Sequence, residues 1–200
     1  MLNPKHSHSP ADILGFIFSL LLSVTFLYTP KADARQYTQT AFSPSPETTA
    51  LITRNILEAQ QNVRVAAYSF TSQPVADALI EAHKNGIDVM VVVDKSQQRA
   101  HTHSIVVKLV QAGIPVRVDR KHSIMHDKYI VIDGHTVETG SFNYTANAEK
   151  HNAENVVVVR NNGSLAEKYL NDWQRLWDES DDYSASKNDS KDTEPEQEGK

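Results

Sequence analysis

The strongest constraint on the fold is an alternation of apolar runs and helical patterns in the first half of the chain. Apolar residues recur with the 3.6-residue period of a helix in three segments, and each segment precedes a short run rich in valine or isoleucine. This order predicts parallel strands joined by helices that pack on the sheet. The predicted helices begin at Pro46, Pro74 and near Ile105, and the predicted strands cover 63–70, 89–93 and 114–119.

The second half of the chain predicts antiparallel pairing. Asp133-Gly134, a dipeptide favoured in two-residue turns, separates two strand-like runs, 128–132 and 135–141. A further apolar strand is expected at 155–159, and Ser164 with Glu167 predicts a capping box for a last helix. The fold class is therefore α/β, with one domain whose mixed, largely parallel central sheet is flanked by helices.

A two-residue turn fixes which side chains of the hairpin share a face. Lys128 should then face Thr139 and His126 should face Ser141, so that these residues and Asn143 project from one side. An imidazole can attack phosphorus or transfer a proton near neutral pH. Lysine and asparagine donate hydrogen bonds to oxygens that gain negative charge. This face predicts a phosphoryl-transfer site that needs neither metal nor cofactor, although a solvated polar face would explain any one residue.

The stretch HDKYIVIDGHTVETGSFN, from His126 to Asn143, resembles the phospholipase D superfamily. It contains HxKxxxxD followed by GSxN, and a single copy on a short chain is similar to bacterial endonucleases of the Nuc type. The resemblance implies a phosphohistidine intermediate and a second motif histidine that protonates the leaving group. Because this chain has one such motif, the resemblance implies a homodimer with a shared site. The candidate catalytic residues are His126, Lys128, Asp133, Ser141, Asn143 and Glu154.

Two of these candidates have an alternative role. Asp133 belongs to the family motif, but the hairpin parity turns it away from the phosphate, so we expect its substitution to damage folding or alignment more than chemistry. Glu154 matches the acidic residue that orients the histidine in the family, and its alternative role is solvation of a strand end.

The ends of the chain predict export and an unstructured tail. Lys5, an apolar run at 13–28 and Ala32-Asp33-Ala34 have the order of a secretory signal, so residues 1–34 are expected to be removed and the protein to be periplasmic or secreted. A membrane anchor is the alternative, but the run is shorter than the ~20 residues that span a bilayer. Residues 35–44 are predicted to be a linker, 45–177 the catalytic domain and 178–200 a disordered acidic tail.

Charge does not exclude a nucleic-acid partner. Residues 178–200 carry nine acidic and three basic side chains, and residues 1–34 carry two of each, so the total of -5 leaves +1 for residues 35–177. Arg117, Arg120 and Lys121 are candidate phosphate contacts, with solvation as the alternative. The chain has no cysteine, which excludes disulfides and thiolate chemistry. His101 and His103 alone are weak evidence for a metal site.

Three functions fit these observations. The first is an endonuclease acting on DNA, with RNA as a further substrate, and with no stable membrane association after signal cleavage. The second is a phospholipase D or cardiolipin-type lipid phosphodiesterase. The third is a binding module that retains the fold without catalysis, and the complete motif argues against it. The cleavage site and the small size of the chain favour the nuclease.

Overall fold

The computed structural model describes residues 35–99 and 104–184. The predicted signal peptide, the pair His101 and His103, and residues 185–200 lie outside the described residues. An eight-stranded sheet has the order β1-β7-β6-β5-β2-β3-β4-β8. The strands are β1 Tyr37–Ser43, β2 Asn62–Ala67, β3 Asp88–Asp94, β4 Val116–Asp119, β5 Lys128–Ile132, β6 Thr136–Gly140, β7 Glu154–Arg160 and β8 Asp181–Asp182.

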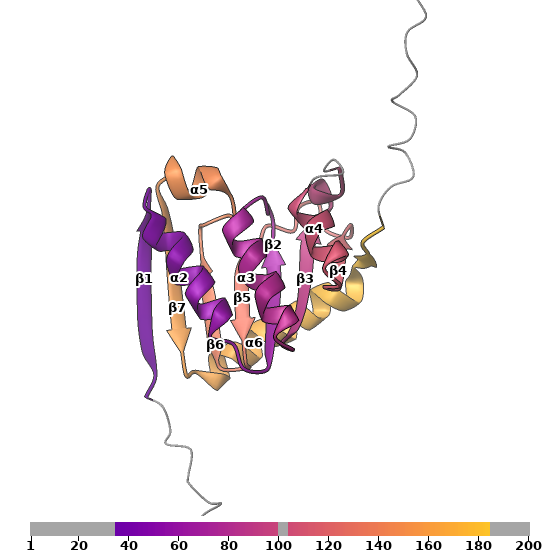
Figure 1. Ribbon diagram of the computed structural model, residues 1–200. Helices are drawn as coiled ribbons and strands as arrows, with labels where there is room; N and C mark the ends of the chain where they lie inside the picture. Colours follow the sequence, from indigo (N-terminus) through magenta and orange to yellow (C-terminus); the bar gives the residue numbers. More distant parts are fainter. Residues whose placement is uncertain (1–34, 100–103, 185–200) are drawn as a thin grey trace, which may run out of the picture. The chain divides into compact units, whose positions relative to one another are not determined.

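The helices cover both faces of this sheet (Figure 1). Helices α2, α3 and α4 pack on one face over a cluster that includes Ile56, Leu79 and Leu109. The long helix α6 packs on the other face, where Trp173 and Leu176 are buried. The helices are α2 Pro46–Leu57, α3 Gln73–Lys84, the 3-10 helix η2 Lys95–Arg99, α4 Ile105–Gln111, α5 Ala146–Lys150 and α6 Gly163–Glu179.

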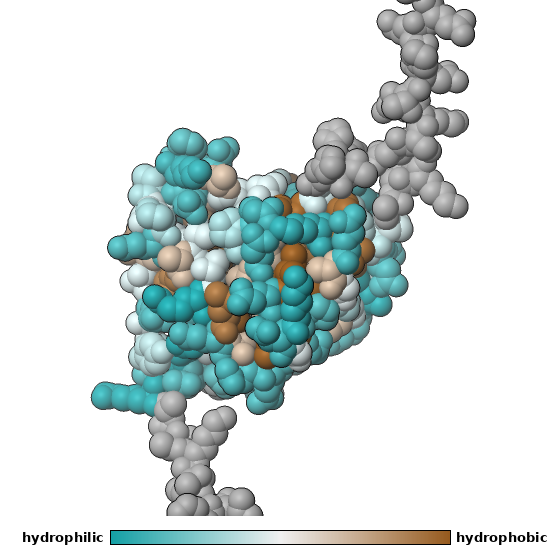
Figure 2. All heavy atoms as spheres, viewed as in Figure 1, coloured by the Kyte–Doolittle hydropathy of each residue, from teal (hydrophilic) through white to brown (hydrophobic). Residues whose placement is uncertain are grey.

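The surface above α2, α3 and α4 is mainly hydrophilic, with small apolar areas between the helices (Figure 2). None of the helices in residues 35–99 and 104–184 is long and apolar enough to cross a membrane. The predicted α/β domain with a mixed sheet flanked by helices is confirmed. The parallel part is smaller than predicted, because β2 pairs with β3 and β3 with β4 in parallel, while the other neighbours are antiparallel.

Two predicted segments, the linker 35–44 and the beginning of the disordered tail at 178, differ from the structure. The segment 35–44 is not a linker, because Tyr37–Ser43 forms the edge strand β1 and pairs with β7 along its full length. The tail is ordered as far as the structure describes it, because α6 continues to Glu179 and β8 pairs with β4. The sequence of β1 alternates weakly, since only Ala41 and Ser43 are buried, and β8 has no apolar residue.

Candidate active site

The chemistry-bearing residues gather at one edge of the sheet because of strand direction. This edge holds the ends of β2 and β6 and the beginnings of β5 and β7, since β5 is antiparallel to β2 and β6, and β7 is antiparallel to β6. It therefore collects Lys128 from the start of β5, Gly140 from the end of β6 and Glu154 from the start of β7. Ser141, the last residue of the predicted strand 135–141, lies just after β6, and His126 lies two residues before β5.

The hairpin differs from its predicted register by one residue. The turn forms as expected, with His135 N donating to Ile132 O at 3.2 Å and with positive φ angles at Asp133 and Gly134. However, the His135 carbonyl accepts from Asn162 N at 2.8 Å, so His135 does not enter the ladder. The first cross-strand pair is therefore Ile132 with Thr136.

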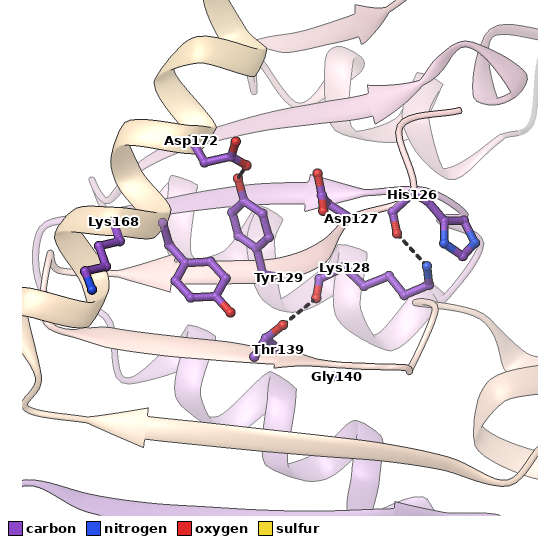
Figure 3. A pocket seen from close by; sticks show the side chains of 9 residues that line it. His126, Asp127, Lys128, Tyr129, Thr139, Gly140, Lys168 and Asp172 are labelled. Atoms are coloured by element: carbon purple, nitrogen blue, oxygen red, sulfur yellow. Dashed lines mark hydrogen bonds between the residues drawn. The ribbon is translucent and has the colours of Figure 1, made fainter. Parts of the chain in front are cut away.

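The shifted register moves Thr139 to the opposite face. Thr139 pairs with Tyr129, so in the ladder it has the parity of Tyr129, which packs against α6, and not the parity of Lys128. The prediction that Thr139 shares a face with Lys128 is wrong. The Thr139 hydroxyl still donates to the Lys128 carbonyl at 3.2 Å, and this contact joins the two strands near the site (Figure 3).

His126 and Lys128 form the centre of the site, and they share a neighbour that the motif did not predict. His126 is exposed, whereas Lys128 is only 8% exposed and its Nζ donates to the His126 carbonyl at 2.7 Å (Figure 3). The Tyr68 ring lies 4.6 Å from the His126 ring, and Lys128 Nζ lies 5.3 Å from the Tyr68 centroid. Tyr68 directly follows β2, and ligand sites of α/β sheets favour such strand ends. This rule could have found it.

The surroundings of the Lys128 ammonium group leave it able to bind an anionic substrate. Burial lowers its pKa below the ordinary value of lysine, and the negative charges of Asp127 and Glu154 partly oppose this effect. The ammonium has one hydrogen bond, to a neutral carbonyl, among the described residues. It can therefore attract phosphate oxygens without first breaking an ion pair.

The GSxN segment lines the same edge. A Cβ atom added at Gly140 would lie 2.1 Å from the Asn155 carbonyl oxygen, so only glycine allows β7 to approach this closely. Ser141 Oγ donates to Glu154 Oε2 at 2.5 Å and accepts from Asn155 N at 3.1 Å. Asn143 Oδ1 is buried and has no hydrogen-bond partner among the described residues, and the donor that this side chain could offer to a ligand is its Nδ2 group.

Glu154 contacts the serine of the motif. Its carboxylate accepts hydrogen bonds from Ser141 Oγ and from Asn152 Nδ2, the latter at 2.9 Å. In residues 35–99 and 104–184, no hydrogen bond joins Glu154 to His126. The role of Glu154 in orienting His126, which the resemblance implies, stays a prediction. In the structure Glu154 instead holds the Ser141 side chain in place.

Asp133 lies at the far end of the hairpin from His126. Its carboxylate accepts hydrogen bonds from three successive backbone N–H groups, those of Gln60, Gln61 and Asn62, at 2.9, 2.8 and 3.0 Å. The five residues of β5 span roughly 16 Å at about 3.3 Å per residue, so Asp133 cannot reach a phosphate at His126. Its contacts fix the hairpin turn to the segment that leads into β2.

Two buried carboxylates hold the loop that leads to His126. Asp94 Oδ2 accepts from Met125 N at 2.9 Å, and Asp119 Oδ1 accepts from His122 N at 3.0 Å. The other oxygen of Asp119 lies 2.6 Å from His122 Nδ1. Burial alone would raise the pKa of Asp119, but the hydrogen bonds from His122 lower it below its usual value. Asp119 is the last residue of a predicted strand and Asp94 directly follows another, so their sequence positions were a signal for this role.

The basic cluster before the motif is occupied by the protein's own acids. Arg117 pairs with Asp182 at 2.9 Å, Arg120 with Asp181 at 3.1 Å and Lys121 with Glu179 at 2.6 Å. The acidic residues at the end of α6 and in β8 therefore compete with any phosphate for this cluster.

The last helix also begins differently from the prediction, since Asn162 Oδ1 caps it by accepting from Leu165 N at 3.0 Å.

Comparisons with known proteins agree with this geometry. Residues 52–177 match the family model "Cardiolipin synthase, PLD-like domain". The chain is 35% identical to phospholipase D of Rickettsia prowazekii over 78% of this chain and 75% of that protein. It is 33% identical to mitochondrial cardiolipin hydrolase of Xenopus laevis over 69% of this chain and 66% of that protein.

A solved structure shows the same fold and the same family. The phospholipase D family member Nuc from Salmonella typhimurium is 38% identical and superposes with a TM-score of 0.69, over 74% of this chain and 99% of that one. The motif, the sheet order and these relatives all indicate the same family. The chain belongs to the phospholipase D superfamily and is a phosphodiesterase of that family.

Proposed function

We propose that the protein is an exported, metal-independent endonuclease with a site shared by two subunits. Its substrate is DNA, and RNA is a further substrate. One observation carries the proposal. Each chain presents one motif imidazole, that of His126, exposed at the sheet edge beside the nearly buried ammonium of Lys128. One imidazole cannot be nucleophile and general acid in the same step, so a second copy must supply the other.

The proposed reaction has two steps. A ring nitrogen of one His126 attacks phosphorus and forms an N–P bond, while the P–O bond to the leaving group breaks. The protonated His126 of the second subunit gives its proton to the departing oxygen. A water molecule then attacks phosphorus and gives its proton to that second imidazole, and the N–P bond breaks. The products are a phosphate monoester and an alcohol, and both histidines return to their starting states.

The other site residues act on charge and position. Lys128 Nζ and Asn143 Nδ2 act as the donors to the non-bridging oxygens, whose negative charge increases during attack. Ser141 stays close to this edge through its contacts with Glu154 and Asn155. In this arrangement, a fixed ammonium replaces the cation that many nucleases bind.

A lipid phosphodiesterase is the second candidate, because relatives in the comparisons are named phospholipase D and mitochondrial cardiolipin hydrolase. The nuclease is preferred because the Ala32-Asp33-Ala34 site predicts a released protein, with no anchor to hold it on lipid. Export is tested by determining the first residue of the mature protein. Mature protein from periplasm or medium should begin at Arg35, whereas an intact Met1 in a membrane fraction would support the anchored alternative.

The substrate is tested by incubating purified mature protein with plasmid DNA and, separately, with vesicles that contain cardiolipin, both in excess EDTA. We expect plasmid cleavage at the rate observed without EDTA. Hydrolysis of lipid alone would replace the nuclease by the second candidate. Cleavage that EDTA abolishes and magnesium or zinc restores would contradict the metal-free reaction.

The shared site is tested by mixing subunits. A heterodimer of wild-type and His126→Ala chains has one imidazole and lacks either nucleophile or acid, so it should be nearly inactive. After verified subunit exchange, a 1:1 mixture should retain about a quarter of the activity of the same total subunits as wild type, the random share of intact dimers. Activity near one half would mean that each chain works alone.

A further inference from the structure

A pocket of about 340 Å³ opens beside the catalytic pair, on the α6 side of the sheet. His126, Asp127 and Lys128 line one part of it, and Lys168, Tyr169 and Asp172 of α6 line the other. Lys168 and His126 lie at opposite ends (Figure 3). This volume is near the lower end of the range for small-ligand sites, about 300 to 1,000 Å³. The pocket can therefore accept a group that is attached to a phosphate at His126.

Lys168 supplies an uncommitted positive charge at the far end. Within residues 35–99 and 104–184, no hydrogen bond or ion pair engages its ammonium group. By contrast, the cations near β8 are paired with acids, as Lys121 is with Glu179. A free ammonium at the opposite end of the pocket from the catalytic imidazole suits a second phosphate on the same substrate.

The middle of the pocket offers an aromatic ring and hydrogen-bond acceptors. The Tyr169 ring packs edge-on against Tyr129, with centroids 4.9 Å apart and planes at 77°. Asp172 accepts a hydrogen bond from the Tyr129 hydroxyl at 2.9 Å (Figure 3). It also accepts one from Arg175 at 2.5 Å. Partial loss of hydration and the charge of Asp172 raise the pKa of Asp127, so the two carboxylates are close enough to interact. A flat group that carries N–H donors matches this lining.

We propose that this pocket binds the nucleoside next to the scissile phosphate, an inference that rests on the proposed nuclease function. The base lies against Tyr169, its amino group donates to Asp127 or Asp172, and the following phosphate contacts Lys168. A nucleic acid supplies all three features in one repeating unit, whereas a glycerol headgroup has no ring for Tyr169. Stacking on an aromatic ring tolerates every base, which agrees with cleavage that lacks sequence preference.

The phosphate contact is tested by substrate length. Oligonucleotides with one phosphodiester are compared with those that carry one further nucleotide, added at either end. Wild type should gain about tenfold in kcat/KM from the added phosphate on one side, whereas Lys168→Gln should gain less than twofold. Lys84→Gln removes the same charge at the end of α3, at the opposite edge and face of the sheet, and should keep the full gain.

The base contact is tested by removing the base. Wild type should prefer an oligonucleotide with the neighbouring base over its abasic analogue by about tenfold, and Tyr169→Leu should abolish this preference while Tyr169→Phe keeps it. Oligonucleotide cleavage with unchanged length and base preferences in both variants would overturn this inference and leave the nuclease in place. Hydrolysis by wild type of cardiolipin vesicles only, slowed by Lys168→Gln, would overturn both and assign the pocket to a lipid headgroup.

Discussion

The two ends of the β5–β6 hairpin carry residues of the same motif but do different work. At the open end, Lys128 is held by one hydrogen bond to a carbonyl and Asn143 Oδ1 has no partner among the described residues. At the turn, Asp133 already accepts three backbone hydrogen bonds. Unsatisfied polar groups are available for chemistry, whereas satisfied ones stabilise structure. The motif therefore joins a reactive end to an anchoring end through one strand.

The largest effect is expected at the open end. His126→Ala removes nucleophile and general acid from a shared site, so kcat/KM should fall by about 10⁴ or more. The free energy of unfolding should stay within about 0.5 kcal/mol of wild type, because His126 is exposed. Kinetics on plasmid DNA and urea unfolding measure both values. A large loss of stability would show that this end also anchors the fold.

Lys128→Ala should lower kcat by roughly 10² to 10³, because the nucleophile remains but charge stabilisation is lost from both subunits. Lys128→Arg serves as the charge-preserving control and should recover part of that activity. As pH rises, wild-type activity should fall when Lys128 loses its proton. Because burial lowers the pKa of Lys128, this fall should occur at a lower pH than the ordinary pKa of lysine. A pH profile of kcat compares wild type with Lys128→Arg, in which this limb should disappear. An Ala variant with wild-type kcat would remove Lys128 from the reaction.

Asp133 should show the reverse pattern. Asp133→Ala loses three hydrogen bonds to a charged acceptor and places alanine at a φ of 53°, so the free energy of unfolding should fall by about 3 to 5 kcal/mol. Asp133→Asn tolerates that backbone conformation and should lose less. In assays well below the melting temperature, both variants should retain kcat within about threefold. A stable but inactive Asp133→Asn protein would place this carboxylate in the chemistry.

The middle of the hairpin predicts a smaller, pH-dependent effect. Glu138 is 2% exposed and accepts from the Tyr144 hydroxyl at 2.7 Å. Burial raises the pKa of Glu138 to about 8, although the Tyr144 hydrogen bond opposes this. The unfolded chain ionises near the ordinary value of 4.5, so the folded state binds more protons between pH 4.5 and 8 and stability falls as pH rises through that window.

This contribution is removed in Glu138→Gln, which keeps the size and an acceptor for Tyr144. Between pH 6 and 8, wild type should lose about 2 to 3 kcal/mol that the variant keeps. Urea unfolding at several pH values measures the difference. Parallel pH profiles of the two proteins would mean that Glu138 is already ionised in the fold.

The sequence predicted those parts of the molecule that local patterns determine. The helices and strands between Pro46 and Asp119 follow apolar periodicity. The motif predicted His126 and Lys128 as site residues, and the structure brings the two together. The hairpin register was missed because it depends on a hydrogen bond from Asn162, far along the chain, to the His135 carbonyl. The α6 pocket was missed because its residues reach the site only through the tertiary fold. Tyr68 was missed because the predicted strand 63–70 continues past Ala67, where β2 ends, so that Tyr68 did not stand out as a strand-end residue.

The pairing of β1 with β7 has a consequence for the order of folding. The hairpin joins neighbours across a three-residue loop, whereas β1 meets β7 across separations from 111 residues, for Ser43 with Glu154, to 123, for Tyr37 with Arg160. Local hairpins form in about 1 to 10 μs, and distant pairings are slower. We therefore expect the end of the hairpin that carries Lys128 to form before β1 closes the edge of the sheet. Until β1 docks, the valines of β7 form an open edge on which other chains can add strands.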